Sequence, residues 1–148
     1  MTMTQRADSG MEQRKLAEMT VGDIMEKEVQ SAHVGTRADV VASLTIEGFG
    51  SVPIVDEQQR LVGIVSEHDL LVILDRGQRW SDLTAREVMS GNPYTVRKEM
   101  IVATLIHVLK ASDLIRVPVL DAQDKLIGIV ARRDIVKAVL NAETVTKP

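Results

Sequence analysis

An internal repeat constrains this chain of 148 residues more than any other feature. Residues 21–74 match residues 85–140 at an offset of 64, which becomes 65 midway. The clearest match pairs residues 61–70 with 126–135, where five of ten positions are identical. Such self-similarity indicates duplication. A unit of about 55 residues is only marginally stable alone, because it buries little of its surface. We therefore expect an α+β fold in which two pseudo-symmetric units pack as one module.

Each copy predicts the order strand, helix, strand, strand, helix. The first helix of copy two has an apolar stripe at i, i+3, i+4 and i+7, formed by Val102, Leu105, Ile106 and Leu109. In copy one, two Val- and Ile-rich runs at 52–55 and 61–65 flank a polar five-residue loop, which predicts a hairpin. Gly77 stands where a left-handed helix C-cap is expected. The predicted organisation is a disordered tail (1–14), a first domain (15–76), a linker (77–84), a second domain (85–141) and a C-terminal tail (142–148).

Composition excludes several classes of function. Hydrophobic residues make up 45% of the chain, enough for a core, whereas there are only three aromatic residues and the net charge is −3. These values argue against a nucleic-acid binder. The absence of cysteine excludes disulfides, thiolate zinc sites and a cysteine nucleophile. No apolar run is long enough to cross a bilayer and no secretory signal is evident, so we expect a cytoplasmic protein without membrane contact. The three histidines are scattered, which predicts no metal site.

The junction between the second hairpin strand and the closing helix carries the polar residues of interest. Ser66 and Asp69 have the spacing of a helix capping box. In copy two, Ala131 replaces the serine while Asp134 stays, so capping explains the second aspartate poorly. A helix dipole also favours a carboxylate there. The alternative is a ligand site in which the carboxylate accepts hydrogen bonds from a vicinal diol. The helix amides, with Arg132 and Arg133, would then suit a phosphate.

Three motifs recur in both copies: an Ile/Val-Met start, a Val-Pro-hydrophobic-hydrophobic-Asp strand, and the segment Leu-hydrophobic-Gly-Ile-Val-x-x-x-Asp. Together they resemble a tandem pair of cystathionine β-synthase (CBS) domains, also called a Bateman module. The resemblance covers about residues 17–141 and implies two β-α-β-β-α units. It also implies adenosine-containing ligands, namely AMP, ADP, ATP, S-adenosylmethionine or NAD, in two clefts that each combine residues of both copies.

The resemblance carries two sets of candidate binding residues onto this chain. Cleft one would use Ser66, Asp69, His68, Thr95, Leu114, Ile115, Arg116 and Pro118. Cleft two would use Asp134, Arg132, Arg133, Ser31, Phe49, Gly50, Ser51 and Pro53. The family prefers Ser or Thr at position 131, so cleft two lacks one hydroxyl contact and has two arginines instead. Which cleft binds more tightly stays open.

We therefore expect a regulatory module that senses adenine nucleotides as a signal of energy or metabolic state. No cofactor is required in this hypothesis, because the nucleotide is a regulatory ligand. The alternative is a scaffold that only dimerises or docks on a separate enzyme or transporter. An enzyme is not expected, since there is no nucleophile–base pair and no Gly-rich phosphate loop. The family pairs such modules into homodimers, so we expect a homodimer with the apolar stripe and closing helices at its contact surface.

Overall fold

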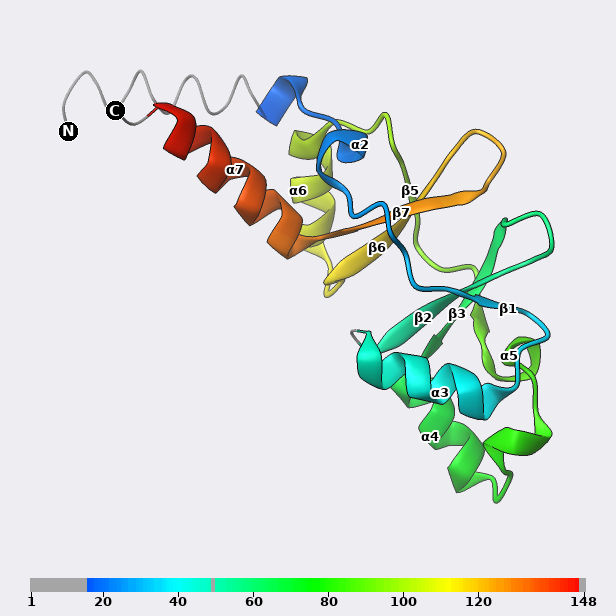
Figure 1. Cartoon of the computed structure of the whole chain (residues 1–148). Coiled ribbons are helices and arrows are strands. Elements are labelled where there is room, and N and C mark those ends of the chain that lie inside the picture. Colours follow the sequence, from blue (N-terminus) through cyan, green and yellow to red (C-terminus); the bar gives the residue numbers. More distant parts are fainter. Residues whose placement is uncertain (1–15, 49, 147–148) are drawn as a thin grey trace. The chain divides into compact units, whose positions relative to one another are not determined.

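The structure is a computed structural model that describes residues 16–48 and 50–146 (Figure 1). It divides into two compact units, each containing one of the two junction aspartates. The Asp69 unit comprises residues 28–94 and 120–126. The Asp134 unit comprises the described residues of 1–27, 95–119 and 127–148. Each unit therefore combines the opening segment of one repeat (residues 19–26 in repeat one, 83–90 in repeat two) with most of the other repeat.

The Asp69 unit is built on a four-stranded sheet in the order β1-β2-β3-β4. Strand β1 (Ala32–His33) lies parallel to β2 (Ser51–Val55), which is antiparallel to β3 (Leu61–Ser66), and β3 is antiparallel to β4 (Ser90–Gly91). Helices α3 (Ala38–Glu47), α4 (Glu67–Asp75) and α5 (Ala85–Val88) and the 3-10 turn η1 (Trp80–Asp82) complete the unit. Aliphatic side chains from the strands and all three α-helices form one core: Val41, Val52, Ile54, Val65, Leu70, Ile73 and Val88.

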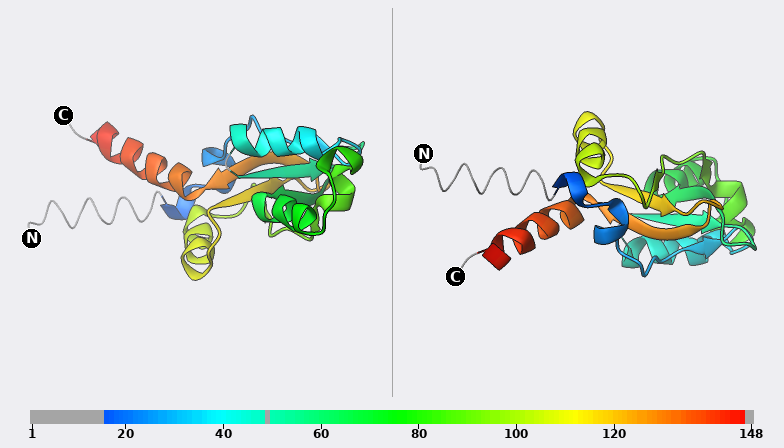
Figure 2. Two further views of the ribbon diagram at one scale, coloured as in Figure 1. Left: turned by 90° about the horizontal axis from the view of Figure 1, so that it is seen from below. Right: turned by 90° about the horizontal axis from the view of Figure 1, so that it is seen from above.

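The Asp134 unit repeats this plan with a three-stranded sheet in the order β5-β6-β7. Its strands are β5 (Val96–Arg97), β6 (Arg116–Leu120) and β7 (Leu126–Ala131), and its helices are α2 (Val21–Ile24), α6 (Val102–Ala111) and α7 (Arg132–Thr146). In Figure 2, α7 (orange to red) continues directly from β7 (orange). The core again joins strands, long helix and opening segment: Val21, Val96, Leu105, Leu109, Val117, Val119 and Val130. Residues 120–126, which are the turn between β6 and β7 with one strand residue on each side, are grouped with the Asp69 unit.

The opening segments are held by backbone hydrogen bonds as well as by burial. In the Asp134 unit, the amide of Val21 donates to the carbonyl of Met100, and Glu26 exchanges two hydrogen bonds with Ile129 on β7. In the Asp69 unit, Ser90 on β4 pairs with Ile64 on β3 in the same way. Because Ile64 and Ile129 are equivalent positions of the two repeats, Ser90 and Glu26 occupy equivalent places.

A glycine on each sheet makes room for this contact. A Cβ built on Gly128 would lie 2.5 Å from the Met25 sulfur and 2.9 Å from the Glu26 carbonyl oxygen. A Cβ built on Gly63 would lie 2.6 Å from the Met89 sulfur and 2.8 Å from the carbonyl oxygen of Ser90. Real Cβ atoms essentially never come this close to other atoms, so a larger residue at either position would force the opening segment to shift.

The predicted order of strands and helices is confirmed in both repeats, as are the five-residue hairpin loop between β2 and β3 and the left-handed Gly77, with φ 74°. The one-turn helices α2 and α5 were not predicted. The expectation that the whole apolar stripe lies at a dimer contact is wrong, because Val102, Leu105 and Leu109 are at most 4% exposed in the single chain. Among the helices that the structure describes, none has the length and apolar character that crossing a membrane requires.

Candidate functional site

The Asp69 junction is a complete helix cap. Strand β3 ends at Ser66, the N-cap of α4, and Asp69 stands in the first turn of the helix. Asp69 Oδ2 accepts hydrogen bonds from the Ser66 amide (2.8 Å) and hydroxyl (2.9 Å), and the Asp69 amide donates to Ser66 Oγ. The Ser90 hydroxyl donates to the other oxygen, Oδ1, at 2.7 Å. The capping-box interpretation is therefore confirmed here, and hydroxyl groups reach both carboxylate oxygens of Asp69.

The Asp134 junction keeps only the backbone half of this arrangement. The amide of Ala131 donates to Asp134 Oδ2 at 2.7 Å. Asp134 therefore caps the start of α7 without a hydroxyl partner, and the expectation that capping explains this residue poorly is wrong. Asp134 is 7% exposed. Among the described residues, no hydrogen-bond donor reaches its other oxygen, Oδ1.

Burial and neighbouring charges act on Asp134 together. Burial raises the pKa of its carboxyl group, and the nearby negative charge of Glu26 raises it further. The Ala131 amide and the charges of Lys137 and Arg116 act in the opposite direction but do not cancel the increase in pKa. For Arg116, burial lowers the pKa, while Asp134 and Glu26 raise it. The two carboxylates thus lie close enough to influence each other.

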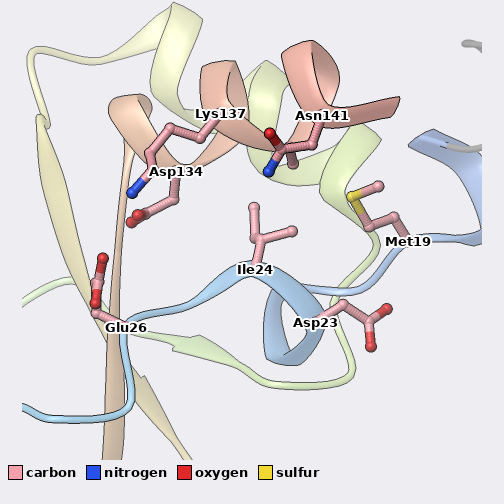
Figure 3. A pocket seen from close by; sticks show the side chains of 8 residues that line it. Met19, Asp23, Ile24, Glu26, Asp134, Lys137 and Asn141 are labelled. Carbon is pink, nitrogen blue, oxygen red and sulfur yellow. The ribbon is translucent and has the colours of Figure 1, made fainter. Parts of the chain in front are cut away.

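A pocket of about 320 Å³ opens beside Asp134 within the same unit (Figure 3). Its walls come from α7 and from the opening segment, with the following lining residues: Met19, Asp23, Ile24, Glu26, Asp134, Lys137, Ala138 and Asn141. In Figure 3, the carboxylates of Asp134 and Glu26 and the amine of Lys137 gather at one end of the pocket, while the Asp23 side chain points away from them. The pocket therefore has a buried carboxylate, that of Asp134, at its charged end.

Sequence reasoning found Asp134 but missed the other polar residues of this pocket. Lys137 and Asn141 follow Asp134 at i+3 and i+7, so helical periodicity could have placed them on the same face of α7. Nothing local in the sequence could have placed Glu26 there, because it reaches the pocket through the pairing of the opening segment with β7.

The two arginines of the second junction differ in their surroundings. The Arg132 guanidinium donates to the carbonyls of Leu114 (3.0 Å), Ser112 (3.2 Å) and Leu109 (3.3 Å), so it caps the C-terminal end of α6. Arg133 is exposed on α7. Arg132 therefore has a structural role, which would compete with the predicted contact to a phosphate. That contact stays a prediction.

The remaining predicted residues are distributed between the two units. In the Asp69 unit, His68 is exposed and Ser31 precedes β1. The carbonyl of Gly50 (φ 83°) accepts a hydrogen bond from the Glu67 amide, and the next predicted residues, Ser51 and Pro53, belong to β2. In the Asp134 unit, Thr95 precedes β5, Ile115 accepts from the Arg132 amide, and the remaining members are Leu114, Arg116 and Pro118. Phe49 lies outside the described residues. The two predicted clefts draw on both units, and their composition stays a prediction. Within the part of the chain that the structure describes, no group of three potential metal ligands is found.

The fold and the two aspartate junctions define a class of protein. It is a paired α+β repeat in which an aspartate carboxylate caps the helix at each strand–helix junction. The CBS domain family model matches residues 21–76 and 85–141, and the chain therefore belongs to the CBS domain family. The resemblance found in the sequence and the predicted fold class are both confirmed.

Solved CBS-pair structures support this assignment. The crystal structure of CBSX2 in complex with AMP has a TM-score of 0.73 and 29% identity, covering 84% of this chain and 98% of that one. CBSX2 is a protein of Arabidopsis thaliana. The CBS domain pair of MJ0100 in complex with 5′-methylthioadenosine and S-adenosyl-L-methionine has a TM-score of 0.67 and 27% identity, covering 84% and 98% of the two chains.

Curated relatives are longer than this chain. An uncharacterised protein of Methanopyrus kandleri is 30% identical over 80% of this chain, which spans 62% of that relative. The inosine-5′-monophosphate dehydrogenase of Methanocaldococcus jannaschii is 27% identical over 84% of this chain, which spans 23% of the enzyme. The chain thus spans less than two thirds of these relatives. In the dehydrogenase, the matching region is a minor part of the whole protein.

Proposed function

We propose that this chain is a regulatory CBS pair that binds adenosine-containing ligands at its two aspartate junctions. The observation that carries the proposal is the buried carboxylate of Asp134 beside a pocket. Its Oδ2 is anchored by a backbone amide, and none of the residues that the structure describes donates a hydrogen bond to Oδ1. A carboxylate oxygen in this state can accept hydrogen bonds from the two hydroxyls of a ribose. Solved relatives bound to AMP, and to methylthioadenosine with S-adenosylmethionine, make the adenosyl group the natural candidate.

Regulation follows from the same proposal. A ligand that binds one conformation more tightly than another shifts the population between them, and this is how such a module would pass a signal to a partner. The regulated activity would lie outside the two repeats, because no described part of them shows a catalytic constellation. The regulated protein and the cytoplasmic location stay predictions.

A panel of ligands tests the proposal by thermal unfolding of the whole chain. AMP, ADP, ATP, NAD and S-adenosylmethionine are compared with GMP and GTP at millimolar concentration. A ligand at ~100 times its dissociation constant should stabilise the folded chain by about 2.7 kcal/mol. Stabilisation by an adenosyl ligand but not by its guanosine counterpart is the expected result.

Variants assign the effect to the junctions. Asp69→Ala and Asp134→Ala should each reduce the stabilisation, whereas Asp75→Ala should not, since this exposed carboxylate lies at the end of α4 away from the cap. Absence of any shift across the panel would refute adenosyl binding. Equal shifts in the wild type and both junction variants would show that the ligand binds elsewhere.

We also propose a homodimer, because large apolar side chains remain exposed on helices of both units. On α4, Leu71 is 62% exposed and Leu74 48%, and on α7, Val136 is 58% and Leu140 54% exposed. Exposed apolar residues that cluster on helices favour an interface. Light scattering should give twice the mass of the chain, and Leu71→Glu with Leu140→Glu should give the monomer mass. A monomeric wild type would refute this proposal.

A further inference from the structure

The two junctions, although equivalent in sequence, differ in the group that faces the aspartate. Asp69 receives a hydrogen bond from the Ser90 hydroxyl, a neutral donor. The equivalent place opposite Asp134 is occupied by Glu26, because Glu26 pairs with Ile129 as Ser90 pairs with Ile64. The second hydroxyl is lost as well, since Ala131 replaces Ser66. One junction therefore surrounds its carboxylate with donors, and the other sets a second carboxylate beside it.

The positive charges of Lys137 and Arg116 offset this acidic pair only in part, since the pKa of Asp134 stays raised despite them. Lys137 is the nearby basic residue of the pocket, yet it forms no ion pair within 4.0 Å with either carboxylate among the described residues. Arg116 influences Asp134 electrostatically but is itself partly buried and does not line the pocket. With Asp23 at the rim, three acidic side chains and one basic side chain line the pocket.

This arrangement has a consequence for the ligand. Burial already disfavours the ionised form of Asp134, and a like charge beside it adds to the cost. A positive centre in the pocket would interact favourably with both carboxylates, whereas a phosphate would be repelled by both. A donor-rich junction such as that of Asp69 carries no comparable discrimination against phosphate.

We propose that the Asp134 pocket selects adenosyl ligands that carry a positive centre, a sulfonium or an ammonium group, over phosphate-bearing ones, and that Glu26 determines this selectivity. The inference rests on the proposed function, since it names the ligand class of one of the same two sites. Glu26 acts through charge and not through the fold, because its backbone makes the contacts with β7 while its side chain is exposed.

A pair of ligands that differ by one methyl group and one charge provides the test. S-adenosylmethionine has a positive sulfur, and S-adenosylhomocysteine has a neutral one. Calorimetric titration of the Asp69→Asn chain, which weakens the other junction, should show tighter binding of the sulfonium by about tenfold, or about 1.4 kcal/mol. The preference should shrink at high salt, because the interaction is partly open to solvent.

Glu26→Gln is the decisive variant. It should bring the two dissociation constants within about twofold of each other and should strengthen AMP binding, as removal of one like charge requires. Glu57→Gln, the same change of charge on an exposed loop residue, serves as the control and should leave the ratio unchanged. Thermal unfolding of each variant confirms that it is folded.

The outcomes separate the two proposals. Equal binding of the two ligands to the Asp69→Asn chain, or an unchanged ratio in Glu26→Gln, would overturn charge selection while leaving adenosyl binding intact. Loss of the sulfonium preference in Asp134→Asn but not in Asp69→Asn would support the assignment to this pocket. Failure of every adenosyl ligand to bind the wild type would overturn both proposals.

Discussion

Replacement of Gly128 by alanine tests how the opening segment of repeat one is held in the Asp134 unit. The added methyl group would lie 2.5 Å from the Met25 sulfur and 2.9 Å from the Glu26 carbonyl oxygen. The methionine side chain can rotate away. The carbonyl cannot, because it accepts the amide of Ile129 at 3.0 Å. The segment must therefore move by about half an ångström to restore an ordinary contact of 3.4 Å.

The cost of this movement can be estimated. Added methyl groups in a well-packed region cost about 1–3 kcal/mol. Alanine also reduces the entropy of the unfolded chain, which stabilises the folded state by about 0.4–1 kcal/mol. We expect a net loss of about 1–2 kcal/mol in the free energy of unfolding. For a chain of this size, that loss corresponds to a decrease of roughly 2–8 °C in Tm.

Gly91→Ala is the matched control for this substitution. Gly91 lies on β4 and pairs with Gly63, and a Cβ there would meet nothing within 4 Å. Its variant should be at least as stable as the wild type in urea unfolding. The reasoning would be refuted if Gly128→Ala were as stable as the wild type, or if both glycine variants lost the same stability.

Two further predictions concern the second junction. Burial holds the pKa of Asp134 above its ordinary value of 3.8, so the folded state binds a proton more tightly than the unfolded state. The contribution of this residue to stability therefore falls as the pH rises from the ordinary pKa through the raised one. Asp134→Asn should therefore flatten urea-derived stability across that pH range, and an unchanged pH profile would contradict the raised pKa. Arg132→Ala should destabilise the chain by about 1 kcal/mol through loss of its hydrogen bonds to three carbonyls at the end of α6. The exposed Arg133→Ala should cost almost nothing. If the two arginine variants unfold alike in urea, the guanidinium of Arg132 does not support the helix end.

Much of the fold could be predicted from local patterns. The apolar stripe of α6, the hairpin of β2 and β3, and the capping box at Ser66 and Asp69 are all short-range features, and each is present in the structure. They could be predicted because helical periodicity, short runs of β-branched residues and cap geometry depend on residues within a few positions of one another. The same reasoning misjudged the apolar stripe as a contact surface, since periodicity identifies an apolar face without saying what covers it.

The candidate site was only partly predictable. Both aspartates were found from the repeat, and Lys137 and Asn141 could have been found from the spacing on α7. The partners of the aspartates could not, because they come from opening segments far away in the chain. Asp69 meets Ser90, while Asp134 lies near Glu26.

The sequence by itself determined the duplication, the order of elements, the CBS family and the position of one aspartate at each junction. Only the tertiary structure decided which opening segment packs against which sheet. The physical reason is that residues 21–25 and 85–89 have similar apolar patterns, so either could cover either sheet as far as local preference is concerned. Burial of Val21 against the strands of repeat two, and of Val88 against those of repeat one, resolves that ambiguity. This choice places a carboxylate beside one aspartate and a hydroxyl beside the other.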